Sequence, residues 1–345
     1  MRTRHELRVA DARELGAIVD GSVHLVVTSP PYPMIEMWDG CFAALDPGIA
    51  AALAGERAAE AFAAMHAALD RVWRELHRVL VEGGIACINI GDAARTLGGN
   101  FRLHPNHARV LDACTGLGFQ NLPAILWRKP TNAPSKFMGS GMLPPGAYVT
   151  LEHEYVLVLR KGGLRAFRTE ADRERRRESA FFWEERNAWF SDVWLGLTGT
   201  NQELPDSETR ARSAAFPFEL AFRLVCMFSV KGDTVLDPFA GTGTTLLAAM
   251  AAERHSLGLE IDAALAGAAE QRLAGAAPEL NRYLTERLAR HFRFVGERKA
   301  AGKELKHFNE PHGAACVSAQ ETALRIRRIR GIERAGPGVF TATYT

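Results

Sequence analysis

Residues 28–32, Thr-Ser-Pro-Pro-Tyr, are the first stretch whose residue types suggest chemistry. They follow the β-branched run 23–27, Val-His-Leu-Val-Val, which predicts a buried strand. The two prolines cannot continue a regular element and have no N–H to donate, so nearby carbonyl oxygens remain free acceptors. Tyr32 adds an aromatic face beside them. The pattern predicts a strand end that presents acceptors and a ring to a ligand, and the plainer alternative is a turn that closes the strand.

A second candidate site lies at residues 237–245, Asp-Pro-Phe-Ala-Gly-Thr-Gly-Thr-Thr. The segment joins a short apolar strand to a helical pattern, which is typical of a nucleotide-binding turn. Gly241 and Gly243 allow a sharp bend and a close approach of the backbone to a ligand. A carboxylate at the strand end, Asp237, would repel a pyrophosphate but attract a cationic amine or sulfonium environment.

Glu260 ends the next predicted strand, about twenty residues beyond the turn, where an acid can bind both hydroxyls of a ribose. A ribose acid without a phosphate cradle favours S-adenosylmethionine over NAD. In the alternative interpretation the glycines make a packing contact, Thr244 or Thr245 caps the helix, and Glu260 is an ordinary strand-end charge.

The two motifs together resemble the two signatures of amino-group DNA methyltransferases. TSPPY precedes DPFAGTGTT, and this order is similar to that of the circularly permuted beta group of restriction–modification and solitary DNA methylases. TSPPY, rather than an Asp-led DPPY, is typical of the N4-cytosine members. The resemblance extends over about residues 7 to 275. It implies transfer of a methyl group from S-adenosylmethionine to N4 of a cytosine in a short duplex sequence.

The resemblance also implies roles for further residues. Asp11 resembles the acid that binds the adenine amino group of the cofactor, and 216–225 resembles the helix over its methionine end. The segments 125–134 and 152–161 resemble the flanks of the base pocket. The residues expected to bind the cofactor are Asp11, Thr28, Pro217, Glu219, Asp237, Pro238, Phe239, Gly241, Gly243, Thr244, Thr245, Glu260 and Ile261.

The expected catalytic residues are Ser29, Pro30, Pro31 and Tyr32. An exocyclic amino nitrogen is a poor nucleophile because its lone pair is delocalised into the ring. Acceptors around its two N–H bonds, the Pro30 carbonyl and the Ser29 hydroxyl, favour a directed lone pair that attacks the sulfonium methyl in line. Tyr32 can stack on the base, which must be flipped out of the duplex. No covalent enzyme intermediate is needed.

The polar segment 162–212 falls where this family carries its target-recognition segment. Its arginines can meet phosphates or guanine edges. The acids interleaved with them equally predict an ion-paired, solvated helix face. The residues expected to contact DNA are Lys129, Asn132, Lys136, Arg165, Arg168, Arg173, Arg175, Arg176 and Arg177. Three tryptophans, Trp183, Trp189 and Trp194, are expected to pack this segment.

Other chemically capable residues have plainer explanations. Glu36 and Asp39 can take the proton that the methylated nitrogen releases, but we interpret them as loop charges. His104 and His107 are spaced for a metal without a matching set of ligands, so we expect surface histidines and no metal.

Hydrophobic periodicity predicts the elements that position these motifs. Helices are expected at 56–80, 106–117, 215–230, 241–253 and 263–275, and strands at 23–27, 85–92, 122–127, 154–160, 234–237 and 256–261. Glu82-Gly83-Gly84 is expected to stop the first helix. The alternation predicts an α/β fold with a mostly parallel sheet and helices on both faces, the Rossmann-like fold of S-adenosylmethionine-dependent methyltransferases.

Four segments are expected along the chain. Residues 1–161 form the catalytic half of the methyltransferase domain, 162–212 the target-recognition segment and 213–280 the cofactor-binding half. Residues 281–345 form a basic extension with thirteen Lys or Arg against six Glu. This extension either widens the DNA footprint or is a solvated appendage.

The composition is that of an ordinary globular protein, with 345 residues, 47% of them hydrophobic, and a net charge of +2. Five scattered cysteines without a CxxC motif fit a reducing cytoplasm. We expect no apolar signal segment and no membrane span. Duplex DNA is the expected partner, and the sequence leaves open a homodimer and a separate cognate endonuclease.

Several competing functions stay open at this point. The nearest is the same chemistry on adenine N6. An NAD-dependent oxidoreductase would use the glycine turn but leaves TSPPY without a role, and a non-catalytic DNA-binding module would not need either motif intact. Protein-glutamine methyltransferases carry their glycine motif first.

Overall fold

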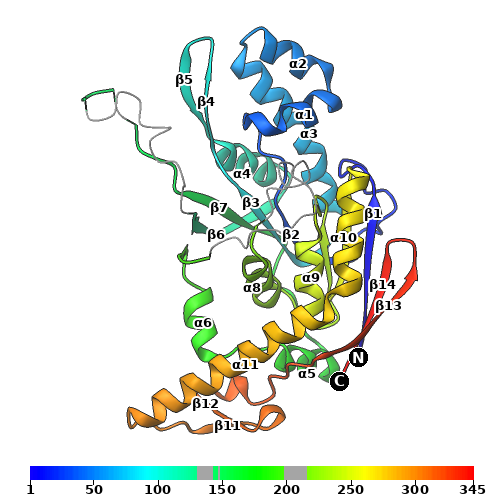
Figure 1. The fold of residues 1–345 in the computed structure, drawn as a ribbon, viewed down its shortest axis with the longest axis vertical. Coiled ribbons are helices and arrows are strands. Elements are labelled where there is room, and N and C mark those ends of the chain that lie inside the picture. Colours follow the sequence, from blue (N-terminus) through cyan, green and yellow to red (C-terminus); the bar gives the residue numbers. More distant parts are fainter. Residues whose placement is uncertain (130–142, 147, 198–215) are drawn as a thin grey trace.

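The computed structural model describes residues 1–129, 143–146, 148–197 and 216–345. Its centre is a ten-stranded mixed sheet in the order β13-β14-β1-β10-β9-β2-β3-β7-β6-β8 (Figure 1). These strands are β1 (Arg2–Val9), β2 (Val23–Thr28), β3 (Leu80–Ile90), β6 (Phe119–Arg128), β7 (His153–Lys161), β8 (Val193–Trp194), β9 (Thr234–Asp237), β10 (His255–Glu260), β13 (Ile329–Gly336) and β14 (Val339–Tyr344). Strands β1, β10, β9, β2 and β3 are parallel, and antiparallel pairs extend the sheet on both sides. The predicted α/β class is confirmed.

Two further hairpins lie outside the main sheet. One pairs β4 (Ala93–Leu97) with β5 (Asn100–His104), and the other pairs β11 (His307–Asn309) with β12 (Ala314–Cys316). In Figure 1 they project from opposite ends of the molecule.

Helices cover both faces of the sheet. The α-helices are α1 (Asp39–Leu45), α2 (Pro47–Ala54), α3 (Ala58–Val79), α4 (Asn106–Gly116), α5 (Glu170–Glu178), α6 (Trp183–Trp189), α8 (Phe218–Phe228), α9 (Thr244–Ala251), α10 (Ala263–Gly275) and α11 (Ala277–Ala300), and the 3-10 turns are η1 (Glu36–Trp38), η3 (Glu310–His312) and η4 (Ala319–Glu321). Among the described residues, none of these helices combines the length and the apolar character needed to cross a membrane.

Alternating side chains of β2 separate the two cores. Leu25 and Val27 pack in the core that also contains residues of α8, α9 and α11, whereas Val26 packs in the core with residues of α3. Successive residues of a strand face opposite sides of the sheet, so a strand buried on both faces is apolar throughout. This explains why the run 23–27 shows no polar alternation beyond His24.

Helix α3 forms one wall of the second core. Met65, Leu69, Val72 and Leu76 recur at spacings of three and four and are buried along one side of the helix. The expectation that Glu82-Gly83-Gly84 stops this helix is wrong, because the chain is already extended at Leu80. The glycines instead lie inside β3, where the pairing with β2 shifts register.

The segment 281–345 is part of the domain and not an appendage. Its first residues continue α11, and β14 pairs antiparallel with β1, from Arg2 beside Thr343 to Glu6 beside Val339. In β14 the side chains of Phe340, Ala342 and Tyr344 are buried while those between them are partly exposed. This alternation is a strand signal in the sequence that the high arginine content of the preceding stretch obscured.

If β14 is part of the core, removing a buried side chain from it must lower global stability. We predict that Phe340→Ala, at a side chain 1% exposed, lowers the free energy of unfolding, by about 3–5 kcal/mol. The control Phe308→Ala, at a side chain 49% exposed in β11, should change it by less than about 1 kcal/mol. Urea titration checks both, and equal small effects would mean that β14 does not fold with the domain.

Candidate active site

The candidate site lies at the carboxyl ends of three neighbouring parallel strands. β2 ends at Thr28, β9 at Asp237 and β10 at Glu260, and β9 lies between the other two. In open α/β sheets this is the edge where ligands bind. The two sequence motifs therefore meet at one edge of the sheet although a long stretch of chain separates them.

A buried carboxylate joins the two motifs. Asp237 is 3% exposed, and its oxygens accept hydrogen bonds from the hydroxyls of Thr28 and Thr245, each at 2.7 Å, and from the backbone N–H of Phe239 at 3.1 Å. Burial raises the pKa of Asp237 to about 6, although these donors act in the opposite direction. The ionised form is thus held in place by hydroxyl groups from both motifs.

The glycine turn between β9 and α9 wraps around Glu260. Gly241 and Gly243 have positive φ angles of 50° and 81°, which favour glycine. The N–H groups of Gly241 and Asp262 donate to the two carboxylate oxygens of Glu260 at 2.8 and 2.9 Å. Burial raises the pKa of Glu260 above its ordinary value. Gly243 occupies the N-cap position of α9, so the alternative in which Thr244 or Thr245 caps this helix is wrong.

A cavity of about 600 Å³ lies between the two motifs. Twelve residues of the two predicted sets line it: Asp11, Ser29, Pro30, Pro31, Tyr32, Asp237, Pro238, Phe239, Gly241, Thr244, Glu260 and Ile261. Thr28 and Thr245 lie behind this wall and bind Asp237. Residues that the sequence analysis did not single out complete the lining, among them Arg13, Trp38, Phe42 and Phe216.

Gly243, Pro217 and Glu219 are three further predicted cofactor residues that do not line the cavity. Glu219 accepts hydrogen bonds from Arg223 at 2.9 Å and from the hydroxyl of Tyr283, so it faces α11. Pro217 serves as the N-cap residue of α8, and its neighbour Phe216 lines the cavity instead. The segment is therefore at the right place, but the helix turns other side chains toward the cavity than those we predicted.

Asp11 lies in the cavity wall with Arg13 as its partner. The guanidinium of Arg13 donates to both oxygens of Asp11, with the shortest contact at 2.6 Å. Burial alone would raise the pKa of Asp11, but the hydrogen bonds from Arg13 hold it below the ordinary value. The carboxylate is therefore ionised and has lone pairs left for a donor in the cavity.

A polar network behind Tyr32 was missed by the sequence analysis. The Tyr32 hydroxyl lies 3.0 Å from the hydroxyl of Ser29 and donates to Glu154 at 2.9 Å, and the side-chain amide of Asn89 donates to it at 2.7 Å. Burial, followed by the charge of Glu154, raises the pKa of Tyr32 well above its ordinary value. Glu154 lies in the segment 152–161, whose family resemblance was noted without a role for this carboxylate.

The predicted DNA-binding arginines do not lie at the cavity. Arg165 pairs with Asp233 at 2.5 Å, directly before β9 begins and close to His24 at the start of β2. Because β7 is antiparallel to β3, it carries the chain from the cavity edge to the opposite edge of the sheet. Helix α5 follows there, at the lower end of the molecule in Figure 1.

The contacts of α5 fit the alternative prediction of an ion-paired, solvated helix face. Arg173 and Arg177 pair with Glu170, and Arg175 pairs with Asp172. Arg176 lies over the ring of Phe167 at 5.0 Å, and the carbonyl of Arg168 accepts a hydrogen bond from Arg173. Within the described residues, these arginines thus make intramolecular contacts away from the cavity, and their contact with DNA stays a prediction. The part of the predicted recognition segment beyond residue 197 lies outside the described residues.

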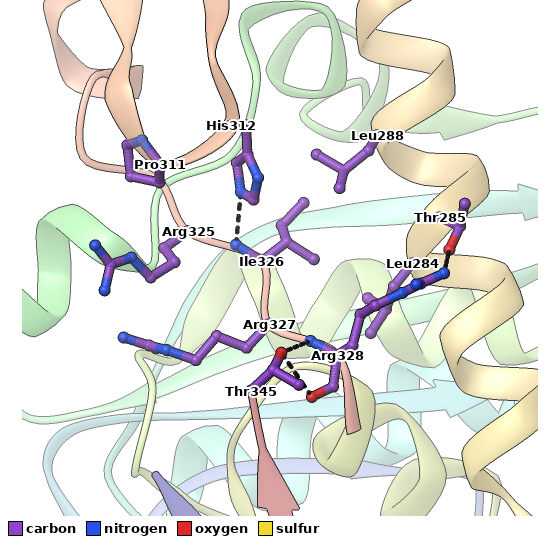
Figure 2. Close-up of a pocket in the computed structure, with 10 residues that line it drawn as sticks. All are labelled: Leu284, Thr285, Leu288, Pro311, His312, Arg325, Ile326, Arg327, Arg328 and Thr345. Carbon is purple, nitrogen blue, oxygen red and sulfur yellow. Dashed lines mark hydrogen bonds between the residues drawn. The ribbon is translucent and has the colours of Figure 1, made fainter. Parts of the chain in front are cut away.

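Three arginines of the C-terminal segment also lie at that opposite edge. A surface depression there is lined by Arg325, Arg327 and Arg328 together with His312 (Figure 2). Arg327 pairs with Glu178 and with Glu253 after α9, and Arg328 donates to the hydroxyl of Thr285. These arginines thus tie the C-terminal segment to the domain.

Of the remaining predicted DNA contacts, Lys129 lies at the cavity edge. Its ammonium group pairs with Glu154 at 3.0 Å, and its side chain is 55% exposed. Asn132 and Lys136 lie outside the described residues.

Two of the three tryptophans pack the segment as predicted. Trp189 and Trp194 are buried, whereas Trp183 is 37% exposed and stacks on Phe294. The prediction of surface histidines is wrong for His104, which is 5% exposed. His107 is half-buried and binds Asp92 at 2.8 Å.

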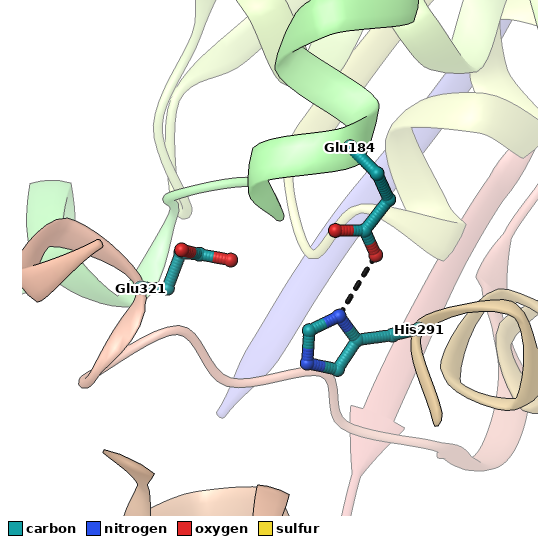
Figure 3. A group of neighbouring side chains, drawn as sticks. All are labelled: Glu184, His291 and Glu321. Carbon is teal, nitrogen blue, oxygen red and sulfur yellow. Dashed lines mark hydrogen bonds and ion pairs between the residues drawn. The ribbon is translucent and has the colours of Figure 1, made fainter. Parts of the chain in front are cut away.

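One group of described side chains has the composition of a metal site. Glu184, His291 and Glu321 lie within 4.8 Å of one another (Figure 3). Each already has a protein partner: His291 binds Glu184 at 2.8 Å, and the oxygens of Glu321 accept the N–H groups of Trp183 and Ser318. We interpret the group as a packing contact that joins α6, α11 and η4.

The bond between Thr28 and Asp237 can be tested by stability. We predict that Thr28→Val destabilises the fold at pH 8, by about 1–3 kcal/mol, because a buried carboxylate loses a donor. The loss should be smaller at pH 5. The folded-state pKa of Asp237, about 6, exceeds its ordinary value, so protonation below pH 6 favours the folded state and removes the charge that needs the donor. Thr28→Ser is the matched control, and a loss independent of pH would contradict this role.

The family model described as DNA methylase matches residues 23–271. The chain is 47% identical to Type II methyltransferase M.MthZI of Methanothermobacter thermautotrophicus over 94% of this chain and 91% of that protein, and 49% identical to M.MjaI of Methanocaldococcus jannaschii over 79% and 91%. The structure of a putative DNA modification methylase from Thermus thermophilus, complexed with S-adenosyl-L-methionine, covers 78% of this chain and 92% of its own, with a TM-score of 0.61 and 39% identity. The chain has the fold of S-adenosylmethionine-dependent methyltransferases and belongs to the DNA methylase family of N6- and N4-methylating enzymes.

Proposed function

We propose that this protein is a cytosine-N4-specific DNA methyltransferase that uses S-adenosylmethionine and acts on a flipped cytosine in a short duplex sequence. It would belong to the permuted beta group, with TSPPY as the catalytic motif. The observation that carries the proposal is the 2.7 Å hydrogen bond between Thr28 and Asp237, because it holds the last residue before Ser29-Pro30 against the start of the glycine turn. A group bound at the turn and a base held at Ser29 would thus share one cavity.

The residues of the cavity fit S-adenosylmethionine. A side chain added at Gly241 would meet nothing within 4 Å, so the backbone of the turn faces open space where a ligand can approach it. Glu260 and Asp11 offer carboxylate lone pairs for ribose hydroxyls and an adenine amino group, and Phe239 lines the same cavity. When bound, the cofactor supplies a methyl group that the sulfonium charge makes electrophilic. Asp237 provides a negative charge on the same wall.

Residues of this chain can orient the amino nitrogen of the base, which is the nucleophile. The carbonyl of Pro30 and the hydroxyl of Ser29 are acceptors in the lining, and both can accept N–H bonds from one amino group. Tyr32, 9% exposed, can stack its ring on the base. Holding the nitrogen in line with the methyl group supplies most of the rate acceleration, since the sulfonium is already a good leaving group.

The choice of cytosine over adenine depends on Ser29. A serine in place of the acid of DPPY is typical of N4-cytosine enzymes, and adenine-N6 methylation is the alternative. Both bases offer an exocyclic amino group beside a ring nitrogen, so the acceptors described above suit either. The Type II names of the relatives lead us to include a separate cognate restriction endonuclease in the proposal.

Duplex DNA must then approach from the cavity edge of the sheet. Lys129 and Arg102 are exposed there, the latter on β5 of the hairpin that follows the carboxyl end of β3. In Figure 1 this hairpin projects beyond the body of the molecule on the same side as α1 and α2. We expect this hairpin to meet the DNA backbone.

Glu260→Ala should weaken S-adenosylmethionine binding. Two charge-assisted hydrogen bonds to ribose hydroxyls would be lost, so we expect the dissociation constant to rise by about 10- to 100-fold. Isothermal titration calorimetry measures it, with the exposed Glu333→Ala as control. Binding of NAD by the unmodified protein with comparable affinity would contradict the proposed cofactor.

Nucleoside analysis of methylated DNA tests the product. We expect duplex DNA treated with the protein and S-adenosylmethionine to yield N4-methylcytosine by mass spectrometry. Ser29→Ala and Tyr32→Ala should lower the rate constant of methyl transfer, each by about 100-fold or more, because they remove an acceptor and a stacking surface from the transition state. N6-methyladenine as the only product would overturn the cytosine assignment, and full activity of both variants would overturn the site.

A further inference from the structure

The hydrogen-bond network behind Tyr32 contains two residues that do not line the cavity, Asn89 and Glu154. We propose that Glu154 and Asn89 are positioning residues that fix the direction of the hydrogen bond between Ser29 and Tyr32. They thereby make Ser29 an acceptor toward the reacting amino group. The inference rests on the proposed function, since it concerns the same amino group.

Glu154 is the end of the network that can only accept. Its side chain is 13% exposed, and three donors converge on it: the Tyr32 hydroxyl at 2.9 Å, the Asn89 amide at 2.7 Å and the Lys129 ammonium at 3.0 Å. If the Glu154 carboxyl group were protonated, its own O–H would be a fourth donor facing these three donors. The ionised carboxylate satisfies them all.

Asn89 adds a second fixed direction. Its side-chain nitrogen donates one proton to Glu154 and the other to the Tyr32 hydroxyl, and the residue is 2% exposed. The opposite amide orientation would set an oxygen against the carboxylate of Glu154, which is repulsive. The Asn89 contact to Tyr32 is therefore one in which Tyr32 accepts.

These partners fix the donor and acceptor roles of the Tyr32 hydroxyl. It has one proton, which goes to Glu154 because that carboxylate cannot donate. Its oxygen accepts from Asn89 and has one lone pair left for Ser29 at 3.0 Å. The raised pKa of Tyr32 keeps the phenolic proton in place at working pH.

Ser29 must therefore donate its proton to Tyr32. Both lone pairs of its oxygen remain, and Ser29 lines the cavity. With the Pro30 carbonyl, the cavity offers acceptors to a group that donates two N–H bonds, and it offers no hydroxyl donor from Ser29 to a base carbonyl or ring nitrogen. This specifies the substrate class as an exocyclic amine.

The packing around the network leaves little room for another arrangement. A side chain added at Gly91 would come within 3.0 Å of Cε2 of Tyr32 and 3.3 Å of Cγ of Glu154. Gly91 directly follows β3, whose last residue Ile90 pairs with Tyr155. The strand pairing of β3 with β7 thus brings Glu154 against Tyr32.

The decisive variant is Glu154→Gln, which keeps the shape and removes the charge. Its amide must turn an NH2 group either toward Lys129 or toward Tyr32 and Asn89, so the direction of the Ser29–Tyr32 bond is no longer imposed. We expect kcat to fall about 10- to 100-fold, with the dissociation constant of S-adenosylmethionine and the KM for DNA changed less than about threefold. Glu152→Gln is the matched control, an exposed carboxylate two positions away that pairs with Arg128, and it should keep full activity.

A double-mutant cycle separates this role from a structural one. Tyr32→Phe retains the ring but frees the Ser29 hydroxyl, so Glu154 can no longer act through it. We expect Tyr32→Phe with Glu154→Gln to be no slower than Tyr32→Phe alone. Losses that multiply, or a Glu154→Gln enzyme with unchanged kcat, would overturn the proposal.

A neutron structure of the unmodified protein provides a second readout that needs neither activity nor a variant that folds. Deuterium on the Ser29 oxygen directed at Tyr32 is expected, and deuterium on Tyr32 directed at Ser29 would overturn the inference. Methylation of a base carbon, or no methylation at all by the unmodified protein, would instead defeat the proposed function. The two failures are thus distinguishable.

Discussion

The structure depends first on the hydrogen bonds that hold the buried carboxylate of Asp237. Burying a carboxylate is unfavourable unless donors replace the lost water, and here two threonine hydroxyls and a backbone N–H do so. One hydroxyl belongs to the end of β2 and the other to the first turn of α9. The same interaction therefore offsets the cost of burial and fixes the distance between the two halves of the site. Because each threonine stands at a strand or helix terminus, a shift of either element would remove one of the three donors from the charge.

The direction of β7 is the second constraint. As an antiparallel neighbour of β3, it starts at the cavity edge and ends at the opposite one. Glu154 near its start is thereby placed against Tyr32, and the arginine-rich α5 beyond its end is placed far from the cavity. In a fully parallel sheet both segments would exchange edges. One reversal of strand direction accounts for the position of Glu154 at the cavity and for that of the arginines away from it.

The features that the sequence predicted correctly are those that the local residue pattern and the chemistry of the motifs determine. The strands around TSPPY and the glycine turn, the amphipathic α3 and the meeting of the two motifs follow from apolar periodicity and from the rule that parallel strands share a ligand-binding edge. Three features could not be predicted from the local sequence pattern. No local signal in the sequence gives the direction of the strands after residue 150. The rotation of α8 about its axis decides whether Phe216 or Glu219 faces the cavity. The pairing of β14 with β1 brings together two segments that are far apart in the sequence. Each is fixed by tertiary packing.

The position of β14 has a consequence for biosynthesis. β1 is translated before β14, the strand that covers its free edge, and almost all the described chain lies between the two. Until then the nascent protein exposes a row of unpaired N–H and C=O groups beside an apolar sheet, which is a template for association with other chains. Arg2, Arg4 and Arg8 along β1 outnumber its one acid, Glu6, so the row carries a net positive charge. Like-charge repulsion between growing copies would limit such pairing until the last hairpin closes the sheet.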